Sequence, residues 1–166
     1  AFESPYSLVK SIEITGKRNS RAELTVEMFG QKMDDSTFTS LSDPTEHEQA
    51  AANLFSLYID ETGAGIGGTQ VTGTLMDFGW KLATGLGPDQ RIDGNLYPAK
   101  HVEDKPALVI DVTFEHNASA VTERTAFKNK TRRFVRLKWV GTSVDGVAGK
   151  TIQLDACGTW ENFTKI

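Results

Sequence analysis

The chain has 166 residues, of which 39% are hydrophobic and 24% charged, and its net charge is −4 at pH 7. This composition is typical of a folded globular protein that can bury a real core, and it argues against a disordered chain. The acidic balance also argues weakly against affinity of the whole protein for nucleic acid.

Membrane insertion, secretion and disulfide bonding are not expected. No apolar run approaches the roughly 20 residues that span a bilayer, and no basic segment followed by an apolar one marks a signal peptide. The missing initiator Met suggests a chain that has been processed or excised. The only cysteine, Cys157, excludes an internal disulfide and a multi-cysteine zinc site.

An amphipathic hairpin is predicted near the start of the chain. Apolar and polar residues alternate without interruption over residues 21–28, which is typical of a half-buried strand. The side chains expected to point inward are Ala22, Leu24, Val26 and Met28. A second strand is expected over residues 8–15, and the turn-like residues 16–20 join the two.

Further strands with one apolar face follow along the chain. They are predicted over residues 54–60, 71–80, 107–115 and 134–140, and in a last strand with Ile152, Leu154, Ala156 and Trp160 on one face. About seven mostly amphipathic strands indicate a mainly β fold, an antiparallel β-sandwich or barrel with one or two short helices. Residues 1–166 are expected to form a single domain.

Two short helices are possible. Asp43, Pro44 and Glu46 have the character of a helix start, which predicts a helix over residues 46–53. Residues 117–130 suit either a short surface helix or an open loop.

Two glycine-rich segments, residues 62–70 and 85–105, are predicted to be long loops. Residues 63–68 of the first satisfy the G-x-G-x-x-G pattern of dinucleotide sites. That site requires a helix to begin at the glycines, whereas β-branched, strand-like residues follow here. An inter-strand loop is therefore favoured over a cofactor site.

Catalytic and metal-binding patterns are not found. The three histidines, His47, His101 and His116, lie on separate predicted elements, and no G-x-S-x-G motif is present. Cys157 is expected to be a packed thiol, because no basic residue near it in sequence would lower its pKa. We therefore expect no enzyme activity, no cofactor and no metal.

A basic cluster stands out in the otherwise acidic chain. Its members are Arg124, Lys128, Lys130, Arg132, Arg133, Arg136 and Lys138. The aromatic residues that would stack on bases are missing from it except for Phe134, so a charge-complementary protein interface is favoured over nucleic-acid binding. Asp34 with Asp35, and residues 46–48, are candidate acidic counterparts.

The sequence patterns of the later segments and their order along the chain resemble those of a known protein family. The segments are VTGTLMDFGW at residues 71–80, DGN at 93–95, LVIDVTFE at 108–115, FVRLKWVG at 134–141 and KTIQLDACG at 150–158. This pattern is similar to the tail tube (major tail) proteins of long-tailed bacteriophages, particularly the later part of the longer members. The resemblance covers about the last two thirds of the chain.

The resemblance implies a virion structural protein without catalytic residues. Such proteins fold as β-sandwiches or barrels with a flanking helix and form hexameric rings that stack into the phage tail, assembled in the host cytoplasm. The implied partners are other copies, tape-measure and tail-end proteins, and DNA that passes without sequence recognition, with no membrane. The residues expected at interfaces are Asp34, Asp35, Gly65, Gly67, Asp93, Gly94, Arg133, Arg136 and Lys138.

A carbohydrate- or ligand-binding β-sandwich module is the alternative. It would use Trp80, Tyr97 or Trp139 as a stacking platform. A core position is favoured for Trp139 and for Trp160.

Overall fold

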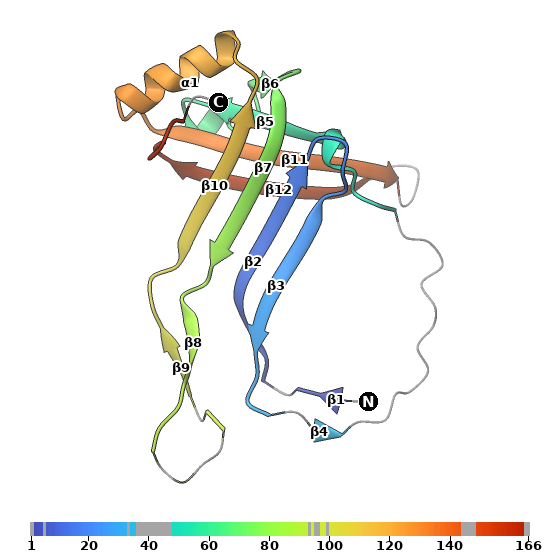
Figure 1. Cartoon of the computed structure of the whole chain (residues 1–166), viewed down its shortest axis with the longest axis vertical. Coiled ribbons are helices and arrows are strands. Elements are labelled where there is room, and N and C mark those ends of the chain that lie inside the picture. The colour runs from blue at the N-terminus through green and yellow to red at the C-terminus, as the bar shows by residue number, and fades with distance from the viewer. Residues whose placement is uncertain are drawn as a thin grey trace. The chain divides into compact units, whose positions relative to one another are not determined.

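A computed structural model of the chain describes residues 2–4, 6–32, 34–35, 48–92, 94, 97–98, 100–143 and 149–164 (Figure 1). Its strands are β1 (Phe2–Glu3), β2 (Leu8–Lys17), β3 (Glu23–Phe29), β4 (Asp34–Asp35), β5 (Phe55–Asp60), β6 (Gln70–Val71), β7 (Leu75–Ala83), β8 (Leu86–Asp89), β9 (Lys100–Glu103), β10 (Ala107–Phe114), β11 (Arg133–Ser143) and β12 (Gly149–Gly158). The helical elements are the 3-10 turns η1 (Ala52–Leu54) and η2 (Gly63–Gly65) and the α-helix α1 (Ala118–Lys128).

The predicted fold class is confirmed: the protein is mainly β, with antiparallel sheets and, in the described ranges, a single α-helix. The strands are more numerous than the seven predicted for two reasons. The short strands β1, β4, β8 and β9 give no alternating signal, and the single strand predicted over residues 71–80 is divided into β6 and β7. By its contacts the chain divides into two compact units. Unit 1 comprises Ala1–Thr15, Glu23–His47 and Gly79–Ile110, and unit 2 comprises Gly16–Ala22, Glu48–Phe78 and Asp111–Ile166.

One four-stranded sheet has the order β10-β7-β2-β3, so β3 and β10 are its edge strands (Figure 1). The predicted hairpin is present, with β2 and β3 paired antiparallel from Leu8 opposite Phe29 to Thr15 opposite Glu23. On one face of this pair, Ile14 lies opposite Leu24 and Ile12 opposite Val26.

The predicted burial of β3 is wrong. Leu24, Val26 and Met28 are 64%, 42% and 55% exposed, whereas their neighbour Ile14 on β2 is buried. Among the described strands, β3 pairs only with β2, and alternation in the sequence does not say whether another layer covers the apolar face of a strand. We call Leu24, Val26 and Met28 the β3 apolar face.

The second four-stranded sheet has the order β12-β11-β5-β6 and supplies the core of unit 2. Three apolar cross-strand pairs lie on one face of its central strands: Phe55 opposite Trp139, Leu57 opposite Leu137 and Ile59 opposite Val135. All six side chains are buried. Within unit 2, the Phe55 ring also contacts that of Phe78 on β7, with ring centroids 4.8 Å apart, so the first part of β7 packs against β5.

The strand predicted over residues 71–80 is two strands that belong to different sheets. β6 pairs with β5, and β7 lies between β10 and β2. The break falls at Gly73, whose φ of +68° is in the left-handed region that glycine adopts without strain. Alternation of side chains cannot reveal this change of sheet, because both halves keep the same period.

The two segments considered as helices differ in outcome, and of the two alternatives left open for residues 117–130 the structure has the helix. Residues 118–128 form α1, and the Asn117 carboxamide oxygen caps it by accepting the backbone N–H of Ala120 at 3.1 Å. The helix predicted over residues 46–53 is wrong where it is described, since Ala51 forms an antiparallel bridge with Arg21 and only the turn η1 follows. Residues 43–47 lie outside the described ranges.

Two further expectations are corrected. The segment predicted as one long loop, residues 85–105, contains the β8–β9 hairpin, in which Leu86 lies opposite Glu103. Cys157, expected to be packed, is exposed on β12. No helix in the described ranges is long and apolar enough to span a membrane.

Candidate interaction surfaces

Arg133, predicted at an interface, is buried in unit 2. Its Nε donates to Glu123 Oε2 of α1 at 3.1 Å, and its Nη1 donates to Glu61 Oε1 at 3.0 Å. The Arg133 and Glu123 side chains are only 7% and 8% exposed. Trp160 Nε1 donates to the same Glu123 oxygen at 2.8 Å. Arg133 therefore joins α1 to β11 and is not presented to another molecule.

Arg136 also has an intramolecular partner. On β11 it lies opposite Asp155 of β12, and its Nε and Nη2 donate to the two carboxylate oxygens of Asp155 at 2.6 and 2.8 Å. These hydrogen bonds from Arg136 hold the pKa of Asp155 below its ordinary value. The guanidinium lies against Gly67, where an added Cβ would stand 2.5 Å from Arg136 Nη1.

The glycine loop that contains Gly65 and Gly67 is anchored by a buried carboxylate. Asp60 Oδ2 accepts the backbone N–H groups of Gly67 and Gly68 at 2.8 and 3.2 Å, and Oδ1 accepts that of Thr69 at 2.8 Å. Burial acts to raise the pKa of Asp60, but the hydrogen bonds from the loop outweigh burial and hold the pKa below its ordinary value. The loop is thus a fixed feature of unit 2.

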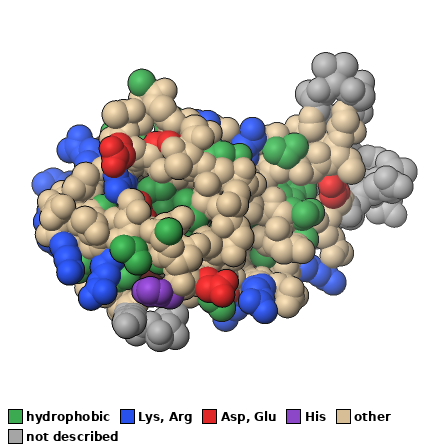
Figure 2. Space-filling model, turned by 90° about the horizontal axis from the view of Figure 1, so that it is seen from above, with side chains coloured by type: hydrophobic (Ala, Val, Ile, Leu, Met, Phe, Trp, Pro, Cys, Tyr) green, Lys and Arg blue, Asp and Glu red, His purple; other side chains and the backbone are tan. Residues whose placement is uncertain are grey.

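The rest of the basic cluster is presented to solvent. Four of its members, Arg124, Lys128, Lys130 and Arg132, are exposed on α1 and the turn after it; we call them the α1 basic surface. Within the described part of the chain, none of the four takes part in an ion pair, and Lys130 Nζ lies 4.8 Å from the centroid of the Phe127 ring. Figure 2 shows Lys and Arg side chains gathered along one margin of the face in view. Lys138 is half-buried on β11, likewise without an ion pair in the described ranges.

The acidic and glycine residues predicted in unit 1 are not gathered into one site. Asp34 and Asp35 form β4, which pairs with β1, and Asp34 Oδ1 makes an ion pair with Lys32 Nζ at 3.0 Å. Gly94 has a φ of +82° and open space around it. Asp93 lies outside the described residues.

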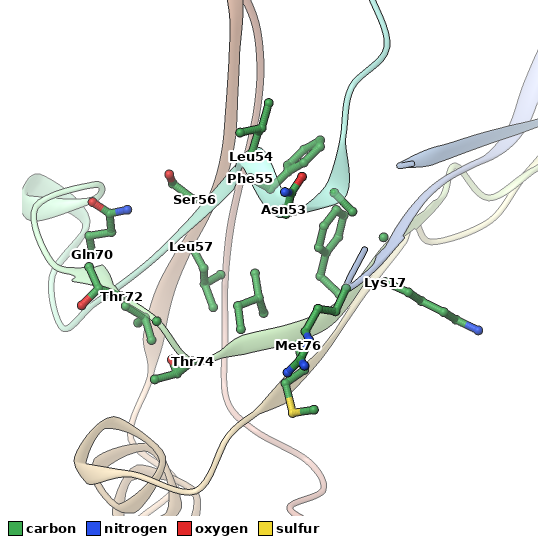
Figure 3. Close-up of a pocket in the computed structure, with 17 residues that line it drawn as sticks. Lys17, Asn53, Leu54, Phe55, Ser56, Leu57, Gln70, Thr72, Thr74 and Met76 are labelled. Atoms are coloured by element: carbon green, nitrogen blue, oxygen red, sulfur yellow. The ribbon is translucent and has the colours of Figure 1, made fainter. Parts of the chain in front are cut away.

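A cavity of about 450 Å³ lies in unit 2 between β5, β6 and the start of β7. We call it the inter-sheet cavity. Its walls include the buried side chains of Phe55, Leu57 and Phe78. At its rim, Leu54 and Met76 are 58% and 38% exposed, and Lys17 extends from β2 away from the cavity (Figure 3).

A second cavity of about 300 Å³ in unit 2 is lined by charged groups, but these already have partners. Asp60 accepts the loop N–H groups, while Glu61 and Glu123 both accept from Arg133. The inter-sheet cavity is therefore the better candidate for an incoming apolar group.

Three kinds of site considered in the sequence can be compared with the described residues. No group of three or more His, Cys, Asp or Glu side chains there could hold a metal ion. The glycine loop leads into the strand β6 instead of a helix, so the geometry of a dinucleotide site is not formed. Trp139 is 4% exposed and cannot serve as the stacking platform of a carbohydrate site, whereas Tyr97 is 49% exposed.

Comparison with known proteins finds no match: no protein-family model matches the chain, and neither does any curated protein sequence.

Sequence reasoning missed the partners that neutralise the two arginines and the exposure of β3. One signal was present for Arg136, because aligning β11 and β12 as a hairpin places it directly opposite Asp155. No such signal identified Glu123, which reaches Arg133 from the helix.

Proposed function

We propose that the chain is a non-enzymatic virion structural protein, a subunit of a phage tail tube that assembles as hexameric rings and stacks into a DNA-conducting channel. Its partners would be other copies of itself, with tape-measure and tail-end proteins at the tube's lumen and ends. The proposal extends the family resemblance of the sequence. It is supported by the mainly β, antiparallel fold with one helix.

The observation that carries the proposal is the β3 apolar face. Three large side chains, Leu24, Val26 and Met28, are exposed on an edge strand that pairs only with β2 among the described strands. An edge strand with an exposed apolar face is a template for association with another chain, and soluble monomers usually protect such edges. Self-assembly would cover it.

Self-assembly is the first property to test. Negative-stain electron microscopy over a concentration series should reveal rings or tubes with a central hole, and light scattering on the same samples should rise with concentration. A protein that stays monomeric throughout the series would contradict the proposed function.

The α1 basic surface gives a second expected result. Replacing Arg124 and Lys128 together by glutamate should weaken assembly, because these exposed cations are available to meet acidic groups of a neighbouring subunit. Sedimentation velocity at low and moderate salt would measure the change, which should shrink as salt screens the charges.

Arg136→Gln is the matched control for that variant. It removes one positive charge from unit 2, but from a residue already paired with Asp155. Assembly of this control should therefore stay close to that of the unmodified protein. The double variant changes the net charge by −4 and the control by −1, so a loss in the control in proportion to its smaller charge change would indicate a general effect of net charge.

A further inference from the structure

Two exposed apolar surfaces of the described residues are complementary in shape: one projects and the other is a cavity. The β3 apolar face is a row of side chains that project from an edge strand. The inter-sheet cavity is concave, with Phe55, Leu57 and Phe78 in its walls and the exposed Leu54 and Met76 at its rim. Its volume of about 450 Å³ falls in the range of pockets that take in apolar groups.

One polar group in the cavity lacks a partner. The Thr74 hydroxyl is buried, lines the cavity and has no hydrogen-bond partner among the described residues. Buried hydroxyls in folded proteins nearly always have one. An occupant with exposed backbone groups, such as an edge strand, can supply it.

The charges beside the two surfaces are opposite in sign. Lys17 and Arg18 line the cavity, are exposed, and make no ion pair in the described part of the chain. Glu23 begins β3, immediately before Leu24, and is likewise exposed and unpaired there. If Leu24 of a β3 edge turns into the cavity, the neighbouring Glu23 side chain points to the other side of the strand, because consecutive strand residues alternate. Lys17 also extends away from the cavity, so the carboxylate and this cation would meet at the rim.

We propose that the inter-sheet cavity of one subunit receives the β3 edge of a second copy of the chain, with Leu24 as the anchor side chain inside the cavity and Glu23 outside it, near Lys17 and Arg18 at the rim. This inference rests on the proposed self-assembly and names its contact. Because the two surfaces are different, the contact is head-to-tail: each subunit gives one β3 edge and offers one cavity. Such a contact forms a ring when the rotation between subunits closes.

The decisive experiment uses two variants that each disable one half of the contact. The edge variant carries Leu24→Asp and Met28→Asp, and the cavity variant carries Leu54→Asp and Met76→Asp. All four positions are exposed, so both variants should fold, which circular dichroism checks. Val102→Asp, at another exposed valine on β9, is the matched control.

Sedimentation velocity should find each variant monomeric at concentrations where the unmodified protein assembles, with self-association weakened at least about tenfold, the size expected for loss of a buried anchor. Mixed together, the two variants should form one-to-one dimers and nothing larger, since the mixture retains one intact edge and one intact cavity. The control should assemble normally.

A charge exchange provides an independent readout. Glu23→Lys alone and Lys17→Glu with Arg18→Glu should each weaken association, and the triple variant should recover it.

Rings that persist in the edge and cavity variants would overturn this contact and leave the tail-tube proposal standing. One-to-one dimers from the mixture without rings from the unmodified chain would support the contact and count against the tube. A chain that never self-associates would overturn both.

Discussion

Replacing Arg133 by alanine should lower the free energy of unfolding by about 3–5 kcal/mol, the range measured when one partner of a buried ion pair is removed. The variant leaves the Glu123 carboxylate buried, 8% exposed, and among the described residues the Trp160 indole N–H is the one remaining donor to it. Chemical denaturation followed by circular dichroism would measure the loss, and the contacts between α1 and β11 should weaken first.

Two controls separate the buried pair from the exposed one. Glu61→Gln removes the other ion pair of Arg133, but Glu61 is 79% exposed, so the loss should stay below about 1 kcal/mol. The double variant Arg133→Met with Glu123→Leu removes both buried charges and should regain most of the lost stability. A single Arg133→Ala variant as stable as the unmodified protein would show that the pair contributes little.

Replacing Asp60 by asparagine should release the glycine loop and lower the free energy of unfolding by about 2–3 kcal/mol, since hydrogen bonds to a charged group contribute about 1.5–3 kcal/mol each and partial bonding to the amide remains. The carboxylate accepts three backbone N–H groups, from Gly67, Gly68 and Thr69. Hydrogen exchange should report faster exchange at these amides, with little change in the β11–β12 hairpin.

The effect of Asp60 should depend on pH in a defined direction. Its pKa in the folded protein lies below its ordinary value, so its contribution is complete at pH values above the pKa of the unfolded chain and is lost as the pH falls through the folded pKa. The difference in stability between the unmodified protein and Asp60→Asn should therefore be constant near neutrality and narrow in strong acid. A difference that grows on acidification would contradict this assignment.

Strand positions in unit 2 could be predicted from alternation alone. The strand predicted over residues 54–60 is β5, Phe55–Asp60, and that over residues 134–140 lies within β11, Arg133–Ser143. The buried alternate residues of these strands leave a clear period of two. The change of sheet at Gly73 was not predictable, because it depends on one backbone torsion and not on hydrophobicity.

The interaction surfaces were less predictable than the fold. The sequence of a single strand does not show whether a basic side chain has an acidic partner. That depends on the residue directly opposite it on the neighbouring strand. Arg136 is paired because Asp155 lies directly opposite it on β12. Arg133 is paired because Glu123, on the helix α1, accepts a hydrogen bond from it. Alternation in β3 identified its apolar face correctly but gave no indication that the strand would lie at an edge.

The pairing of β5 with β11 in unit 2 also has a consequence for folding during synthesis. β5 and β11 pair across 74 to 84 positions of sequence, from Asp60 with Phe134 to Phe55 with Trp139, whereas β11 and β12 form a local hairpin. Such distant pairing must wait until the later strand has been synthesised. At roughly 5–20 residues per second, a nascent chain carries the apolar face of β5 without its partner for roughly 4–15 s. During that interval the apolar side chains of β5 that pair with β11 in the folded protein are exposed to other chains and to chaperones.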